Sequence, residues 1–154
     1  MEQPGKLIIE PIGIVYNGVQ ESRDASFDWS GITSQIELEE NYSKYTRGLE
    51  GFSHLWVIFW IHRASKKKLA AEIHPKGDKT LPLVGVFASR SPNRPNSVGL
   101  KLAEIIRVEG KLITVKGLDA LNGTPVIDIK PYSPGYDSVS EFRVPPWSSS
   151  FQNG

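Results

Sequence analysis

The most regular hydrophobic pattern in the chain lies at residues 52–62, with the sequence FSHLWVIFWIH. In an extended strand, alternate side chains point to opposite faces. One face then carries His54, Trp56, Ile58, Trp60 and His62, and the other carries Leu55, Val57, Phe59 and Ile61. Both sets contain large apolar groups, so the pattern predicts a strand covered on both faces.

Further strands follow from shorter runs. A strand is expected from Lys6 through LIIEPIGIVY, with Pro11 at an edge or bulge, before the Asn17-Gly18 turn. A short strand at residues 35–38 precedes a brief helix at 39–47 that ends at Gly48. Residues 100–121 supply two or three strands, with a hairpin at Glu109-Gly110.

The segment GTPVIDIK alternates apolar and polar residues. Regular alternation places Val126, Asp128 and Lys130 on one face and Ile127 and Ile129 on the other. A carboxylate and an ammonium on one strand face indicate either a polar cavity or an internal ion pair.

Short strands, 14 glycines, 11 prolines and the lack of long helical patterns define the fold class. We predict an all-β protein, a single antiparallel β-barrel domain with short helices and long polar loops. The 154 residues suffice for one domain over residues 1–154, with a core at about 7–137 and a C-terminal tail at 138–154.

Composition removes several chemistries. Without cysteine, the chain has no disulfide, thiolate nucleophile or cysteine metal site. His54, His62 and His74 lack compact ligand spacing, so no metal is expected. The longest apolar run is far shorter than the roughly 18 residues of a membrane span, and no signal-peptide pattern is seen. We therefore expect a cytoplasmic protein without a membrane partner.

Charge is unevenly distributed along the chain. Residues 62–101 contain nine Lys or Arg against two acids, a net charge of +7, whereas the remainder carries −6. A local basic field can attract a phosphate-bearing partner even when the total charge is near zero. A solvated lysine-rich loop explains the same charges equally well.

The basic region contains a stiff polar loop within GVFASRSPNRPNSVGL, residues 85–100. Pro92 and Pro95 restrict its backbone. Arg90 and Arg94 offer forked donors to an anion, and Asn93 and Asn96 can recognise hydrogen-bonding edges. The alternative is a solvated proline-rich turn. The sequence has no dinucleotide fingerprint, P-loop, hydrolase elbow or zinc-protease motif, which disfavours the common enzymes that carry those motifs.

Three motifs in order, GLEGFSHLWVIFWIH, GVFASRSPNRPNSVGL and LDALNGTPVIDIKPYSP, resemble the TsaA-like family, which includes the TrmO-type tRNA methyltransferases. The resemblance covers about residues 9–136. It implies a β-barrel that binds S-adenosyl-L-methionine, is usually a homodimer, and acts on tRNA. TrmO-type members methylate N6 of threonylcarbamoyladenosine at position 37 of tRNA, so the resemblance implies a methyltransferase of that kind.

The resemblance also implies site residues. Those for the cofactor are Ser30, Gly31, His62, Arg63, Arg90, Leu100, Asp119, Ala120, Leu121 and Asn122. Asp128 is the candidate base or orienting group, with Lys130 and Tyr132 beside it as charge partner and hydrogen-bond donor. Candidate RNA contacts are Asn93, Arg94, Asn96, Lys66, Lys67 and Lys68.

Three alternatives stay open at this point. Asp128 and Lys130 can form a purely structural pair. The protein can be a non-catalytic S-adenosyl-L-methionine-binding or sensor protein, or a generic RNA-binding barrel.

Overall fold

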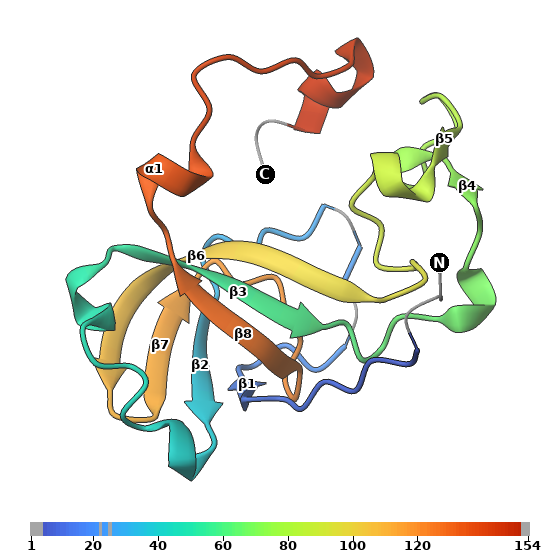
Figure 1. Cartoon of the computed structure of the whole chain (residues 1–154). Helices are drawn as coiled ribbons and strands as arrows, with labels where there is room; N and C mark the ends of the chain where they lie inside the picture. The colour runs from blue at the N-terminus through green and yellow to red at the C-terminus, as the bar shows by residue number, and fades with distance from the viewer. Residues whose placement is uncertain (1–4, 22, 25, 152–154) are drawn as a thin grey trace.

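Six antiparallel strands close into a barrel in the computed structural model, which describes residues 5–21, 23–24 and 26–151, without the side chains of Lys68 and 149–151. Around the barrel the order is β1 (Gly13–Tyr16), β2 (Thr33–Leu38), β7 (Leu112–Lys116), β6 (Val98–Glu109), β3 (His54–Trp60) and β8 (Pro125–Pro131). The predicted all-β antiparallel barrel is confirmed (Figure 1).

The remaining elements are short. β4 (Glu72–Ile73) pairs with β5 (Val84–Gly85) in a two-stranded sheet beside the barrel, and α1 (Pro134–Asp137) follows β8. Single 3-10 turns occupy Glu40–Tyr42, Leu49–Gly51, Lys66–Lys68, Pro75–Gly77, Val86–Ala88 and Pro146–Phe151. Within the described residues, no helix has the length and apolar character needed to cross a membrane.

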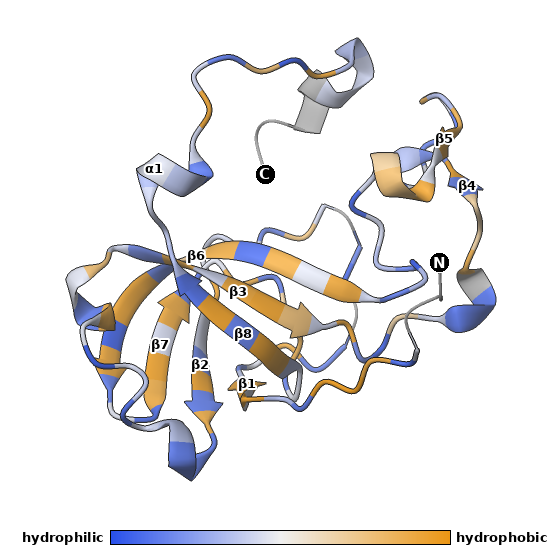
Figure 2. Ribbon diagram, in the orientation of Figure 1, coloured by the Kyte–Doolittle hydropathy of each residue, from blue (hydrophilic) through white to orange (hydrophobic). Residues whose placement is uncertain are grey.

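The barrel interior is filled by alternate side chains of every strand. Leu55 and Val57 are fully buried while Trp56 and Ile58 are only half-buried, which confirms the predicted two faces of β3. Branched aliphatic side chains dominate the centre, as expected where pleated strands pack closely. Figure 2 shows hydrophobic residues recurring along the barrel strands. The fully buried members include Val15, Ile36, Leu55, Val57, Ile113, Val115 and Val126.

Two expected elements differ from the prediction, since one strand is shorter and one helix is replaced by turns. The strand predicted from Lys6 begins only at Gly13, and Leu7, Ile8 and Ile9 are exposed. Pro11 lacks a backbone donor, so the ladder cannot extend through it in the regular way. The predicted helix at 39–47 is a 3-10 turn followed by further turns, because its Asn, Ser, Tyr and Thr residues favour helices poorly.

The alternation predicted for β8 is confirmed for Asp128, Ile129 and Lys130 but is wrong for Val126. Ile58 pairs with Asp128 but Phe59 pairs with Val126, so β8 contains an irregularity at Ile127. A bulge of this kind shifts the side-chain parity of a strand. Val126 therefore points into the core, where it is fully buried, and Asp128 lies on the opposite, outer face.

β6 is longer than its neighbour β7 and extends past it. The last residue of β7, Lys116, pairs with Glu104, so residues 98–103 of β6 pair only with β3. This overhanging part of β6 lies at the barrel end where β1, β3 and β7 finish and β2, β6 and β8 begin. We call this end the loop end and the opposite one the far end.

Candidate functional site

At the loop end, one asparagine holds the loop of residues 117–124 in place. The Asn17 side chain donates to the Ala120 carbonyl at 2.9 Å and to Ser34 Oγ at 3.0 Å, and it accepts from the Val19 N–H at 2.9 Å. Its own backbone N–H donates to Asn122 Oδ1 at 3.0 Å. These four bonds fix the path of the predicted cofactor segment Asp119–Asn122.

Asp119 is the charged residue of this loop. Its side chain is exposed, but protein atoms crowd round the carboxyl group. The resulting desolvation raises the pKa of Asp119, while the charges of Lys101 and Arg90 oppose that rise. The carboxyl is therefore partly desolvated at the loop end, within reach of the charges of two cations.

His62 and Arg63 follow β3 at the same end. His62 Nδ1 lies 3.3 Å from Oγ1 of the buried Thr124, in hydrogen-bonding distance. Desolvation lowers the pKa of His62, and the charge of Arg63 lowers it further. The imidazole is consequently neutral at pH 7. Arg63 donates to the Gln20 carbonyl and so ties β3 to the segment after β1.

Arg90 and Leu100 meet at the open edge of β6. The Ile61 N–H donates to the Ser97 carbonyl, and the Ile105 N–H donates to the Ser53 carbonyl. Ser97, just before β6, and Ile105 within it are therefore positions whose peptide groups point toward β3. Antiparallel pairing alternates, so the peptide groups of Leu100 point away from β3. Arg90 Nη2 donates to the Leu100 carbonyl at 3.0 Å. The Leu100 side chain is on the outer face and 44% exposed, so its backbone rather than its side chain faces the site.

The other predicted cofactor residues lie at the loop end as well. Ser30 and Gly31 immediately precede β2, and the Ser30 N–H donates to Asp28 at 2.8 Å. Ala120 is buried and Leu121 half-buried, whereas the Asn122 amide bonds Gln20 at 3.4 Å. The structure thus brings together at one end the ten residues expected to bind a cofactor. Their contact with a ligand remains a prediction.

Three of the six candidate RNA-binding side chains are engaged within the protein. Arg94 donates to the carbonyls of Ser89 at 3.1 Å and Ser91 at 3.2 Å. Asn93 accepts from the Ser65 N–H at 3.2 Å, and Lys66 donates to the Pro95 carbonyl at 2.8 Å. These bonds make the loop of residues 89–97 rigid, as its prolines predict.

The remaining RNA candidates are Asn96, Lys67 and Lys68. Asn96 and Lys67 are exposed, and their side chains make no hydrogen bond or ion pair to the described part of the chain. They are accordingly the ones whose polar atoms are open to a partner. The side chain of Lys68 lies outside the described residues.

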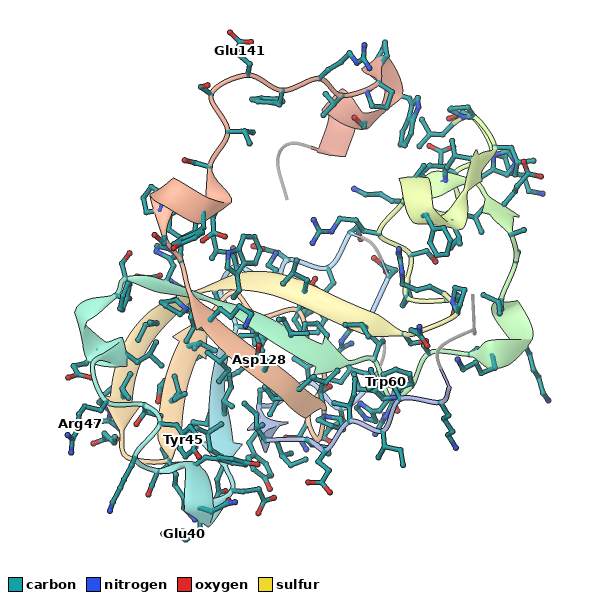
Figure 3. All side chains as sticks on the ribbon, in the orientation of Figure 1. Glu40, Tyr45, Arg47, Trp60, Asp128 and Glu141 are labelled. Carbon is teal, nitrogen blue, oxygen red and sulfur yellow. The ribbon has the colours of Figure 1, made fainter. Side chains whose placement is uncertain are left out.

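The three predicted catalytic residues do not join the loop-end cluster. β8 runs from Pro125 at the loop end toward the far end, where the Tyr132 N–H donates to the His54 carbonyl at 3.0 Å. Along β8, Asp128 lies roughly 10 Å from Pro125 at the loop end, and Tyr132 lies roughly 20 Å from it. Lys130 Nζ lies 2.7 Å from Asp128 Oδ2, so the internal ion pair suggested by the sequence forms. Figure 3 labels Asp128 midway along the barrel.

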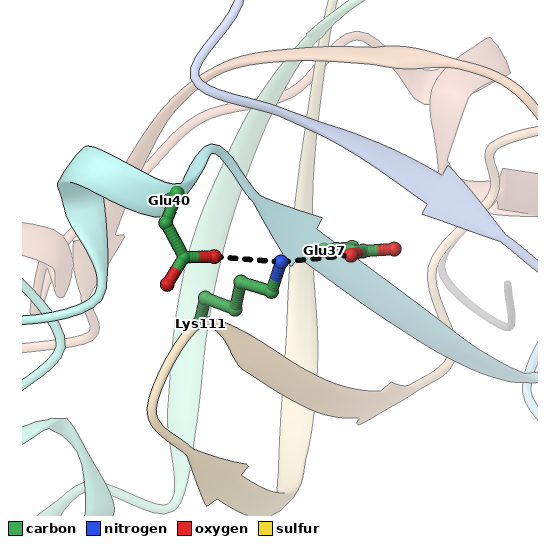
Figure 4. Close-up of polar contacts among 3 residues, drawn as sticks. All are labelled: Glu37, Glu40 and Lys111. Atoms are coloured by element: carbon green, nitrogen blue, oxygen red, sulfur yellow. Dashed lines mark ion pairs between the residues drawn. The ribbon is translucent and has the colours of Figure 1, made fainter.

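A cavity of about 530 Å³ opens at the far end. Tyr42, Tyr45 and Phe52 line it, together with Arg47 and, on the barrel side, Asp128. Tyr45 and Arg47 are labelled at this end in Figure 3. Nearby, Lys111 Nζ bridges Glu40 at 2.9 Å and Glu37 at 3.2 Å, which raises the pKa of Lys111 and links the β6–β7 hairpin to β2 (Figure 4).

Sequence reasoning missed three contributors. Asn17 was interpreted only as a turn residue, although its side chain organises the 117–124 loop. Thr124 orients His62. Lys101 looked like one of many surface lysines, but its pairing with Val57 places it on the inner face of β6. Only the alternation of inner and outer positions along β6 could have distinguished Lys101 from the surface lysines in the sequence. Among the described residues, no three His, Asp or Glu side chains gather as a metal site.

The fold and the site define a closed antiparallel β-barrel protein with charged and amide groups gathered at one barrel end. The chain belongs to the family of the tRNA-methyltransferase O N-terminal domain, whose model matches residues 22–138. The resemblance to the TsaA-like family is therefore confirmed.

Individual relatives show how far the similarity extends. A human tRNA (adenine(37)-N6)-methyltransferase is 35% identical over 161 residues, which cover 98% of this chain and 36% of that protein. An S-adenosyl-L-methionine-binding protein of Archaeoglobus fulgidus is 39% identical over 139 residues, with 89% and 97% covered. The crystal structure of TrmO from Pseudomonas aeruginosa has a TM-score of 0.70 and 30% identity, with 90% of this chain and 62% of that chain covered. The chain thus spans about a third of the human relative and most of the archaeal one.

Proposed function

We propose that this protein binds S-adenosyl-L-methionine at the loop end and transfers its methyl group to N6 of an adenosine in tRNA. In its most specific form, the proposal names threonylcarbamoyladenosine at position 37 as the acceptor. The observation that carries it is the gathering of Asp119, Arg90 and the His62–Arg63 pair at one barrel end in a member of this family.

The residues at the loop end suit the chemistry of this cofactor. S-adenosyl-L-methionine has an ammonium, a carboxylate and ribose hydroxyl groups. Asp119 can accept from the ammonium or the hydroxyls, and Arg90 can hold the carboxylate. The backbone N–H of Leu100 points to the open edge of β6 and offers a further donor.

The bound cofactor supplies an activated methyl group on sulfur, so the protein chiefly has to align the acceptor with it. The His62 imidazole is neutral and held by Thr124, so it adds no positive charge near the sulfonium. An exocyclic nitrogen loses a proton when it is methylated. Asp128 is our candidate for accepting that proton, with Lys130 holding its carboxylate in place.

A direct experiment tests the activity. The purified protein is incubated with labelled S-adenosyl-L-methionine and tRNA from a strain that lacks the endogenous enzyme. Label is expected in an N6-methylated adenosine nucleoside identified by mass spectrometry.

Arg90→Ala is expected to lose about tenfold or more in cofactor affinity by calorimetry, because a charge-assisted contact is removed. Arg107→Ala, which removes an exposed Arg107–Glu109 pair, is the matched control. Tight cofactor binding without transfer to any RNA would contradict the proposal.

A non-catalytic binding or sensor protein is the second candidate. It is favoured by the place of the Asp128–Lys130 pair on the outer face of β8, outside the loop-end cluster, and by the archaeal relative that bears only the name of a binding protein. This candidate expects cofactor binding with no methyl transfer, and a partner whose binding depends on the cofactor.

We also propose that the working unit is a homodimer that uses the outer face of β3 and β6. Val98 is 37% exposed and Leu100 44%, and they adjoin the half-buried Ile58 and Trp60. A contiguous apolar surface of this kind favours a protein interface.

Sedimentation velocity tests this surface. Val98→Glu adds a charge on the proposed interface and is expected to shift a dimer to monomer. Val139→Glu is the control, because Val139 is 70% exposed in the segment after α1, outside the barrel. Monomeric wild-type protein at all concentrations would contradict the proposal.

A further inference from the structure

Lys101 occupies an unusual position for a lysine. It pairs with Val57, which is fully buried, and shares its face with Gly99 and Ala103. Opposite residues in an antiparallel pair project to the same side, so the Lys101 side chain starts on the inner face of β6. It is half-buried there, in the overhang where β6 has passed the end of β7.

The Lys101 ammonium is placed to act at the loop end. Its charge, with that of Arg90, is felt by the Asp119 carboxyl. To the described part of the chain the ammonium makes neither a hydrogen bond nor an ion pair within 4 Å. A lysine can lay its aliphatic stem along apolar surface and keep its head in water. The buried Ala103 beside it and Leu118 before Asp119 belong to the same core.

The resulting charge set consists of one carboxylate, Asp119, and two cations, Arg90 and Lys101, at the loop end. A ligand that carries both a carboxylate and an ammonium on one carbon complements this set. Arg90 is partly committed, because Nη2 donates to the Leu100 carbonyl at 3.0 Å. Lys101 has all three donors open, so it can supply the charge that Arg90 shares with the backbone.

We propose that Lys101 is a second anchor for the carboxylate of the amino-acid part of the methyl donor, next to Arg90, while Asp119 takes the ammonium. This inference rests on the proposed binding of S-adenosyl-L-methionine. It assigns to Lys101 discrimination between ligands that have the amino-acid part and ligands that lack it. Lys101 is thus a specificity residue, separate from methyl transfer itself.

Two related ligands isolate this effect. S-adenosyl-L-homocysteine and 5′-methylthioadenosine share the adenosine and a neutral thioether, but only the first has the amino-acid part. Affinities of both, and of S-adenosyl-L-methionine, are measured by calorimetry for wild type, Lys101→Met and Lys101→Arg. Lys116→Met is the matched control, since exposed Lys116 is on the neighbouring strand β7, across from Glu104.

Lys101→Met is expected to weaken both amino-acid ligands about tenfold and to change 5′-methylthioadenosine less than twofold. Lys101→Arg is expected to recover most of the lost affinity, and Lys116→Met to behave as wild type. Thermal unfolding confirms that each variant is folded.

The results that would contradict the role of Lys101 differ from those that would contradict the proposed function. Equal weakening of all three ligands, or no weakening of any, overturns the role of Lys101 and leaves the proposed function intact. Wild-type protein that binds none of the three overturns both proposals.

Discussion

At the scale of single residues, the site depends on how the protein sets the charges of two groups. Asp119 is partly desolvated between two cations, and His62 is kept neutral beside Arg63. Each group has a different pKa in the folded and unfolded chains, so each links stability to pH. The stability contribution of Asp119 falls as the pH rises, whereas that of His62 increases as the pH rises.

Asp119→Asn is expected to stabilise the protein at pH 7 while weakening cofactor binding about tenfold or more. A raised folded-state pKa means that the ionised carboxylate is unfavourable in the folded protein. The contribution of Asp119 to the free energy of unfolding is fully present below the unfolded-state pKa of about 3.9. It is lost as the pH rises through the folded-state pKa. Thermal unfolding should therefore show a higher Tm for the variant at pH 7 and a smaller gain at pH 4. A lower Tm at pH 7 would show that the carboxylate stabilises the loop instead.

His62→Gln is expected to flatten the loss of stability on mild acidification. The folded-state pKa of His62 is lowered, so its contribution is complete above the unfolded-state value of about 6.5 and declines as pH falls through the folded-state value. Urea unfolding of wild type between pH 7 and pH 5 should show a larger decrease than the variant shows. His54→Gln is the control, and parallel profiles for wild type and His62→Gln would exclude the effect.

At the scale of elements, the barrel depends on two close approaches between strands. Gly13 in β1 lies against the Glu37 backbone of β2, and Gly99 in β6 lies under the Phe59 ring of β3. A Cβ at either place would overlap its neighbour, whereas Gly31 has open space around it. These two glycines therefore let the inner faces pack at native density.

Gly99→Ala is expected to reduce the free energy of unfolding by about 1–3 kcal/mol, because Phe59 has to shift in a filled core. Gly13→Ala should cost at least as much, since a backbone oxygen cannot move aside as a ring can. Gly31→Ala is the control and should be close to neutral. Chemical unfolding measures all three, and equal stabilities would show that the barrel relaxes freely at both positions.

Sequence patterning predicted the elements that alternate cleanly and failed where one residue interrupts the alternation. β3 matched because all its inner residues are apolar, and the hairpin after Glu109 matched because Gly110 adopts φ 58°. β8 did not match at Val126, since the irregularity at Ile127 is fixed by pairing with β3 and leaves no local signal. The loop-end residues came from family motifs, whereas Lys101 required the register of β6.

At the scale of the whole molecule, the predicted acceptor residues and cofactor residues lie apart within one subunit. Asp128 and Lys130 are on the outer face, as are Val98 and Leu100 at the proposed interface. A dimer through this face would bring the Asp128–Lys130 pair of each protomer to the boundary between subunits. Whether a complete site combines residues of both protomers can then be measured.

Mixing two inactive variants tests this arrangement. Arg90→Ala and Asp128→Asn are expected to be inactive alone in methyl transfer. After subunit exchange, about a quarter of wild-type activity is expected if one site of the mixed dimer has both native residues, by the statistics of random pairing in a closed two-fold dimer. The same mixture with Val98→Glu in both chains is the control and should stay inactive. Absence of recovery after verified exchange would place both residues in one subunit's site.

The overhang of β6 also affects the tendency of the protein to aggregate. The backbone groups of Leu100 and Leu102 face outward along an edge that pairs with no strand in the described part of the chain. Bare edges of this kind invite pairing with strands of other molecules. Arg90 covers one of these positions by its bond to the Leu100 carbonyl. The Arg90 guanidinium, which we assign to the ligand, therefore also protects this strand edge from pairing with other molecules. One side chain thus has both roles.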